Sequence, residues 1–201
     1  MTAVARIARG WEALDAVPDP EIPVVSIRDL GILRDVRLAE DGETIEAVIT
    51  PTYSGCPAMS QIEEDVGRAL DAAGLRPWRV LTVLAPAWTT DWITALGQAR
   101  LREYGIAPPH AVATHAAGDV RPLRFVPRGG RAQTMPDGVT TSVATSVTTS
   151  VATSTAAATA VACPRCGSLH TEELARFAST ACKALYRCLA CREPFDYFKP
   201  Y

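Results

Sequence analysis

The spacing of apolar residues predicts three helices in the first 110 residues. Between residues 2 and 16, and again between 57 and 73, apolar side chains recur every three or four positions, as in an amphipathic helix. Residues 92–104 predict a third helix. The second and third helices end at Gly74 and Gly105, and glycine commonly stops a helix.

Alternation of apolar and polar residues predicts three strands. Residues 32–38 and 45–49 alternate on either side of an Asp-Gly dipeptide at 41–42, which favours a tight hairpin turn. Residues 79–85 predict the third strand. Three strands and three helices indicate an α+β fold for residues 1–108, in which a small three-stranded sheet is packed by helices.

Residues 137–160 contain short tandem copies of a Thr/Ser/Val/Ala sequence and few large apolar side chains. Such a segment buries too little surface to offset the entropy lost on ordering, so the sequence predicts a flexible, disordered linker. Its alternating Val and Thr would also suit a β-strand, which is the alternative. Together with the Pro- and Gly-rich stretch before it, the linker is expected to cover residues 109–160. It would join the domain at 1–108 to a second domain at 161–201.

The overall charge does not favour nucleic-acid binding. The chain has 201 residues, 20 Lys and Arg, 22 Asp and Glu, and a formal net charge of −2, whereas nucleic-acid-binding domains usually present a strongly basic surface. No segment approaches the roughly 20 apolar residues that cross a bilayer. We therefore expect a cytoplasmic protein without nucleic-acid or membrane partners. In that compartment, cysteines more often bind metal or react than form disulfides.

Two Cys-x-x-Cys pairs near the C-terminus carry the strongest chemical signal. Cys163 and Cys166 form the first pair, and Cys188 and Cys191 form the second. Four thiolates suit a tetrahedral ion, and a domain of about 40 residues has a core too small to fold well without such support. We expect a zinc-ribbon-like domain that binds zinc. Iron in a tetrathiolate site is the alternative, because ligand count does not separate the two metals.

Cys182 lies between these pairs and leaves three interpretations open. It could pack as a small buried side chain, substitute for a metal ligand, or act as a reactive thiol whose ionisation Lys183 and Arg187 favour. A structural role in core packing is the simplest of the three.

Cys56 lies in a Gly-Cys-Pro turn where the second helix is expected to begin. Pro57 suits the first helical position, so Cys56 would lie near the N-cap, where the helix dipole and free backbone N–H groups favour an anion. We therefore expect a lowered thiol pKa, as a reactive or metal-ligating cysteine would have. On these residues alone, packing of a small buried side chain in a helix-sheet corner is the simpler interpretation, and a reactive or metal-ligating role is the alternative.

Two further polar stretches are candidates for a site around this cysteine. Asp19 and Glu21 lie among prolines, which predicts a rigid, non-helical loop. Thr89, Thr90 and Asp91 follow the third predicted strand, at a strand-to-helix turn. Taken singly, these residues are more simply explained as turn residues and a helix cap. Their occurrence together favours an accessory role beside the cysteine.

Three stretches, DPEIPVVSIRDLGILRDV at 19–36, TYSGCPA at 52–58 and APAWTTDWI at 85–93, resemble the MIP18-like family of iron-sulfur cluster assembly domains. The resemblance covers about residues 10 to 107. It implies a role in the maturation of metal centres, in which Cys56 transiently holds iron or an iron-sulfur cluster beside the acidic pair.

Taken with CPRCGS at 163–168 and the cysteine-rich end at 179–201, the whole chain resembles the PaaD (also PaaJ) family of phenylacetate-CoA oxygenase subunits. This family combines an assembly-type domain with a zinc-ribbon-like tail and belongs to the phenylacetyl-CoA 1,2-epoxidase system of bacterial phenylacetate degradation. The resemblance implies an accessory or maturation subunit. Its partners would be protein subunits of that system, including the diiron and reductase components. The Thr/Ser/Val repeat departs from the family pattern and implies an unusually long tether.

Motifs of common enzymes are absent from the sequence. It has no Gly-rich phosphate loop, no Gly-x-Ser-x-Gly and no His-Glu-x-x-His, and it lacks the Glu-x-x-His pairs that hold diiron centres on helices. We therefore expect the chain not to catalyse oxygenation alone. The alternative is an integral oxygenase component whose four-cysteine site transfers electrons or supports the structure.

Overall fold

The computed structural model describes residues 2–53, 55–110 and 160–200. The described residues on both sides of the long gap belong to one compact unit. The linker expected at 109–160 lies almost entirely outside the described residues. The domain boundaries on either side of it stay predictions.

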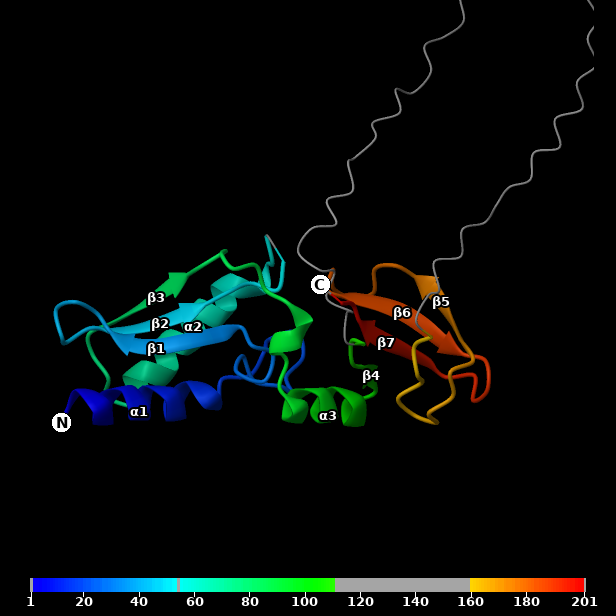
Figure 1. Cartoon of the computed structure of the whole chain (residues 1–201), viewed down its shortest axis with the longest axis horizontal. Helices are drawn as coiled ribbons and strands as arrows, with labels where there is room; N and C mark the ends of the chain where they lie inside the picture. Colours follow the sequence, from blue (N-terminus) through cyan, green and yellow to red (C-terminus); the bar gives the residue numbers. More distant parts are fainter. Residues whose placement is uncertain (1, 54, 111–159, 201) are drawn as a thin grey trace, which may run out of the picture. The chain divides into compact units, whose positions relative to one another are not determined.

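The structure contains two small sheets and three α-helices among the described residues (Figure 1). The N-terminal elements are α1 (Ala3–Asp15), β1 (Leu33–Leu38), β2 (Ile45–Ile49), α2 (Ala58–Ala72), β3 (Trp78–Thr82), the short 3-10 helix η1 (Thr90–Trp92), α3 (Ala95–Tyr104) and β4 (Ile106–Ala107). The C-terminal elements are β5 (Thr171–Ala175), β6 (Lys183–Cys188) and β7 (Pro194–Phe198). The α+β class, with a three-stranded sheet packed by helices, is confirmed.

The first sheet has the strand order β1-β2-β3. β1 and β2 form the expected antiparallel hairpin, and β3 runs parallel to β2 after the crossover through α2. Alternate residues of β2 are fully buried on the side of α1, namely Ile45, Ala47 and Ile49. On the opposite face, Glu46 accepts hydrogen bonds of 2.8 Å from the Nε atoms of Arg37 and Arg79, one on each neighbouring strand. These cross-strand pairs match the observed register.

Two boundaries differ from those that the sequence pattern predicts. β3 ends at Thr82 because its pairing partner β2 ends opposite it, at Ile49. The third helix begins at Ala95, and the turn before it forms η1. Thr94 sets this start, since its hydroxyl accepts a hydrogen bond of 2.9 Å from the backbone N–H of Gly97.

The second sheet joins distant parts of the sequence in the strand order β4-β7-β6-β5. β4 follows α3 directly and pairs in parallel with β7, with Ile106 opposite Asp196 and Ala107 opposite Tyr197 (Figure 1). The pairs β7-β6 and β6-β5 are antiparallel. An edge strand of the C-terminal sheet therefore comes from the N-terminal segment.

One hydrophobic core extends from the N-terminal segment into the C-terminal one. Phe198, the last residue of β7, is 1% exposed and belongs to the same buried cluster as Leu30 and Ile32. Its ring centroid lies 6.0 Å from that of Trp88. Cys182 belongs to this cluster as well. A smaller buried cluster lies within the C-terminal sheet.

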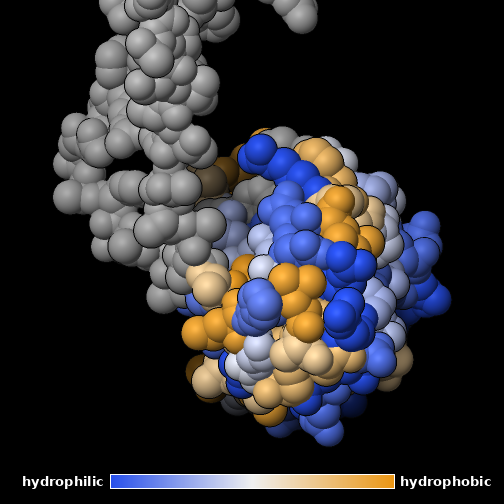
Figure 2. Space-filling view, turned by 90° about the vertical axis from the view of Figure 1, so that its right-hand side faces the viewer, coloured by the Kyte–Doolittle hydropathy of each residue, from blue (hydrophilic) through white to orange (hydrophobic). Residues whose placement is uncertain are grey.

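The surface mixes hydrophobic and hydrophilic residues on the face drawn in Figure 2. Exposed apolar side chains of the C-terminal segment include Leu169, Leu174 and Phe177. In the part of the chain that the structure describes, no helix has the length and apolar character needed to span a bilayer.

Gly31→Ala is expected to destabilise the protein more than Gly74→Ala. Both glycines have a φ of +68°, so either substitution introduces left-handed strain of about 1–2 kcal/mol. A Cβ at Gly31 would also lie 2.6 Å from Trp92 Cβ and 2.7 Å from its carbonyl oxygen, whereas nothing lies within 4 Å at Gly74. Displacing Trp92 should add about 1–3 kcal/mol. Urea unfolding of both variants measures the difference. Equal losses of unfolding free energy would show that the close approach of Gly31 to Trp92 does not affect stability.

Candidate functional site

Each Cys-x-x-Cys pair lies in a tight backbone turn. In the first, the backbone N–H of Gly167 donates to the carbonyl of Cys163 at 2.9 Å, and in the second, that of Cys188 donates to the carbonyl of Glu193 at 3.0 Å. The residue after each pair has a positive φ, +74° at Gly167 and +68° at Arg192. Arg192 is the one non-glycine residue with a positive φ among the described residues. The two turns thus share a conformation that few arginines adopt.

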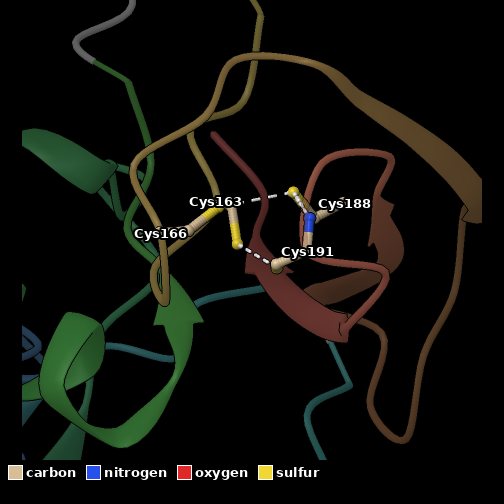
Figure 3. A group of neighbouring side chains, drawn as sticks. All are labelled: Cys163, Cys166, Cys188 and Cys191. Carbon is tan, nitrogen blue, oxygen red and sulfur yellow. Dashed lines mark hydrogen bonds between the residues drawn. The ribbon is translucent and has the colours of Figure 1, made fainter.

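The four predicted metal ligands meet at one point (Figure 3). Their sulfurs all lie within 4.8 Å of one another, with 3.8 Å between Cys163 and Cys191 and 3.6 Å between Cys166 and Cys188. Metal–sulfur bonds of about 2.3 Å in a tetrahedron require sulfur–sulfur separations of about 3.8 Å. The thiols are therefore spaced as ligands of one ion, which would join the two turns.

Backbone hydrogen bonds favour the thiolate form of Cys188, whereas burial and hydrogen bonds to the neighbouring cysteines raise the pKa values of Cys166 and Cys191. The N–H of Cys191 donates to the sulfur of Cys188 at 3.5 Å. This hydrogen bond, with one from Ala190, lowers the pKa of the Cys188 thiol to about 6. A thiolate is the form that binds a metal ion.

A second group of candidate residues lines a narrow cavity beside α2. Its volume is about 10 Å³, and its lining includes Asp19, Glu21, Cys56, Met59 and Cys182. The turn cysteine and the acidic pair therefore line one cavity, together with Cys182 from the C-terminal segment.

The loop that carries the acidic pair is held by local hydrogen bonds. The side chain of Asp19 accepts hydrogen bonds from the backbone N–H groups of Glu21 at 3.0 Å and Ile22 at 2.8 Å. The backbone N–H of Asp19 donates to the carbonyl of Val25 at 2.9 Å. Asp19 is only 5% exposed. The loop is non-helical and well braced, as the prolines predict.

Cys56 lies just before the helix, and its pKa prediction was wrong. Pro57 is the N-cap of α2. Burial raises the pKa of the Cys56 thiol and outweighs the hydrogen bonds from the backbone N–H of Ala58 and the side chain of Tyr53. The helix terminus does favour the thiolate, but partial removal of the sulfur from water opposes it more strongly.

Cys182 faces the acidic pair and is not part of the four-cysteine cluster. Cys182 is 4% exposed. Its sulfur lies 3.0 Å from Thr180 Oγ1 and 4.0 Å from Glu21 Oε2, and the thiol donates a hydrogen bond to Glu21. Burial raises the pKa of this thiol too. The residue fills space in the core, as the simplest interpretation expected, and it also contributes a donor atom to the cavity.

Thr89, Thr90 and Asp91 are not among the residues that line the cavity. The hydroxyl of Thr89 accepts a hydrogen bond of 3.3 Å from the backbone N–H of Asp91 and caps η1. Thr90 is 3% exposed, and its hydroxyl has no hydrogen-bond partner in the described part of the chain. These residues build the turn between Trp88 and α3.

Negative charge is costly in the cavity. Burial raises the pKa of Asp19. Burial also raises the pKa of Glu21, and the negative charge of Asp19 raises it further. Lys183, which is 5% exposed and lies 3.2 Å from Asp196, offsets both shifts in part. Because two thiols and two carboxyl groups meet where their anions are poorly solvated, a bound cation would stabilise their charged forms.

The sequence analysis missed several residues of the cavity lining, among them Met59 and Phe198. Met59 lies in the first turn of α2, and its backbone N–H donates to the carbonyl of Cys56 at 3.3 Å, which places it beside Cys56. Phe198 comes from the end of β7 and closes the cavity from the C-terminal segment. No local pattern near Phe198 indicates this contact.

Comparisons with known proteins match both halves of the chain. Residues 11–80 match the family described as "Iron-sulfur cluster assembly protein", and residues 147–199 match the "PaaD zinc beta ribbon domain". A solved Bacillus anthracis "Domain of Unknown Function DUF59" is 29% identical, with a TM-score of 0.45, and covers 49% of this chain and 93% of its own. A Mycobacterium tuberculosis protein described as associated with Fe-S complex assembly and repair is 34% identical, with a TM-score of 0.30, and covers 49% and 84%.

One curated relative matches along almost the whole chain. It is an Escherichia coli K12 protein described as one subunit of "Putative 1,2-phenylacetyl-CoA epoxidase". The two are 41% identical over 191 residues, which cover 94% of this chain and 90% of the relative. Since this match spans both the assembly-type segment and the cysteine-rich ribbon, the chain belongs to the PaaD family.

Proposed function

We propose that this chain is an accessory subunit of the phenylacetyl-CoA 1,2-epoxidase system and assists the assembly of iron or iron-sulfur centres in its partner subunits. The observation that carries this proposal is the meeting of Cys56, Asp19 and Glu21 at one cavity. These three residues lie in the segment that matches the iron-sulfur cluster assembly family. The relative's description as an epoxidase subunit supports the choice of system.

The chemistry of the cavity suits temporary binding of iron. Thiolate and carboxylate donors together suit a borderline divalent ion such as Fe(II). Cys56 is half-buried, so its sulfur is shielded without being fully enclosed. Deprotonation of the thiol in this buried setting costs free energy, which weakens the metal complex and favours release to a stronger site. The receiving sites would be those of the diiron and reductase components, in the cytoplasm.

The four-cysteine cluster has a different role in this proposal. Cys163, Cys166, Cys188 and Cys191 would hold a resident zinc ion that stabilises the C-terminal sheet. Zinc has no redox chemistry, so the cluster would not carry electrons. The accessory subunit then supports the oxygenase without catalysing the epoxidation.

Cys56→Ser is expected to leave the fold intact and to lower the iron content of the partner components. Loss of a ligand should weaken iron binding by at least about tenfold. The variant and the wild type would be expressed with the full epoxidase system, and iron and activity measured in the purified oxygenase. Ser60→Ala, an exposed change on the same helix, is the matched control and should change neither quantity. Equal iron content and activity for Cys56→Ser and Ser60→Ala would refute the proposal.

A further inference from the structure

The cavity at Cys56 is built from both ends of the chain. Cys56 precedes α2 in the N-terminal segment, and Cys182 precedes β6 in the C-terminal segment, yet both line the same space. Glu21 links them: its Oε2 lies 4.0 Å from the sulfur of Cys182, and its charge acts on the thiol of Cys56. The site that the assembly-type segment offers therefore has a second thiol beside it.

The position of Cys182 follows from the packing of the C-terminal sheet. Its carbonyl accepts a hydrogen bond of 2.9 Å from the backbone N–H of Lys199, which follows β7. The neighbouring Phe198 lines the same cavity and packs against Trp88. These contacts with the C-terminal sheet thus fix the position of the Cys182 backbone. The sulfur is brought to the cavity whenever the C-terminal segment is folded and docked.

The size of the cavity limits what it can hold. A volume of about 10 Å³ is close to the roughly 10–15 Å³ that one water molecule needs. A bare metal ion would draw the surrounding donor atoms toward it, because among the described residues only the four-cysteine cluster already has its ligand atoms gathered. An iron-sulfur cluster, with several iron and sulfide atoms, needs several times more room.

We propose that Cys182 is a second thiolate ligand of the Cys56 site, so that the two ends of the chain together bind one divalent metal ion and not a cluster. Glu21 supplies a carboxylate oxygen, which lies 4.0 Å from the sulfur of Cys182, and each thiol that binds the ion releases its proton to solvent. The inference rests on the proposed function, since it defines the cargo that Cys56 holds. It also gives the ribbon a direct part in binding that cargo.

An anaerobic titration with Co(II) tests this site in the full-length protein loaded with zinc. Cobalt bound by thiolates absorbs in the near ultraviolet, so the absorbance reports how many sulfurs bind. Wild-type protein should bind one Co(II) with two thiolates while it retains its zinc. Cys182→Ser and Cys182→Val should each weaken this binding by at least about tenfold and remove part of the thiolate absorbance. Ser179→Ala, an exposed change in the same loop, should behave as wild type.

The two Cys182 variants separate ligation from packing. Valine fills the space of the thiol without a donor atom, so unchanged binding in Cys182→Val would overturn the inference. If Cys56→Ser abolishes cobalt binding while both Cys182 variants bind as wild type, Cys182 is no ligand and the proposed function stands. If the wild type binds no ion beyond its zinc, both proposals fail. A parallel loading with Fe(II) and sulfide should give bound iron without acid-labile sulfide, and stoichiometric sulfide would overturn the single-ion assignment.

Discussion

Cys188→Ser is expected to lower tightly bound metal to well below one ion per chain and to unfold the C-terminal sheet. Cys188 is fully buried, and its sulfur lies 3.6 Å from that of Cys166. Structural zinc contributes about 10–16 kcal/mol of apparent binding free energy, which is comparable to the whole stability of a small protein. The small core of the C-terminal sheet cannot replace that support.

Elemental analysis and amide hydrogen exchange check this result together. Amides of β5, β6 and β7 should lose protection in the variant, whereas those of β1, β2 and β3 should retain it. Ser179→Ala is the control, because it is an exposed change in the same segment that leaves the four-cysteine cluster and Cys182 intact. A Cys188→Ser protein that keeps its metal and a protected β6 would contradict a structural role for the cluster.

Phe198→Ala is expected to lower the free energy of unfolding by about 3–5 kcal/mol, the usual cost of removing a buried aromatic ring. Phe198 is 1% exposed and packs in the main core against Trp88. Its loss would leave a cavity where the two ends of the chain meet and would loosen the C-terminal segment from the N-terminal one. Urea unfolding followed by tryptophan fluorescence measures the change.

Phe177→Ala provides the comparison for this prediction. Phe177 belongs to the same C-terminal segment but is 64% exposed, with the ammonium group of Lys199 4.2 Å from its ring centroid. Removing it should cost less than about 1 kcal/mol. Equal losses in the two variants would mean that Phe198 does not join the segments energetically.

The elements that sequence analysis predicts well are those set by local pattern. The β1-β2 hairpin follows from alternation around an Asp-Gly turn, and α2 follows from its apolar stripe and the glycine at 74. The meeting of Cys163, Cys166, Cys188 and Cys191 follows from their paired spacing, because each pair forms its own turn. In each case the residues that decide the outcome are close together in the sequence.

The features that sequence analysis does not predict depend on contacts between distant residues. The pairing of β4 with β7 and the burial of Phe198 join segments separated by the whole repeat region. Cys182 enters the Cys56 cavity for the same reason. The pKa of Cys56 also depends on tertiary burial, which outweighs the local helix terminus from which we predicted the opposite shift.

Direct transfer of iron from the Cys56 site is the most direct test of this account. The full-length protein, loaded anaerobically with labelled Fe(II), would be mixed with each metal-free epoxidase component in the presence of a chelator that captures free iron. We predict that the wild type delivers iron to at least one component and that Cys56→Ser delivers little. Equal delivery by the two proteins, or none by either, would contradict the account.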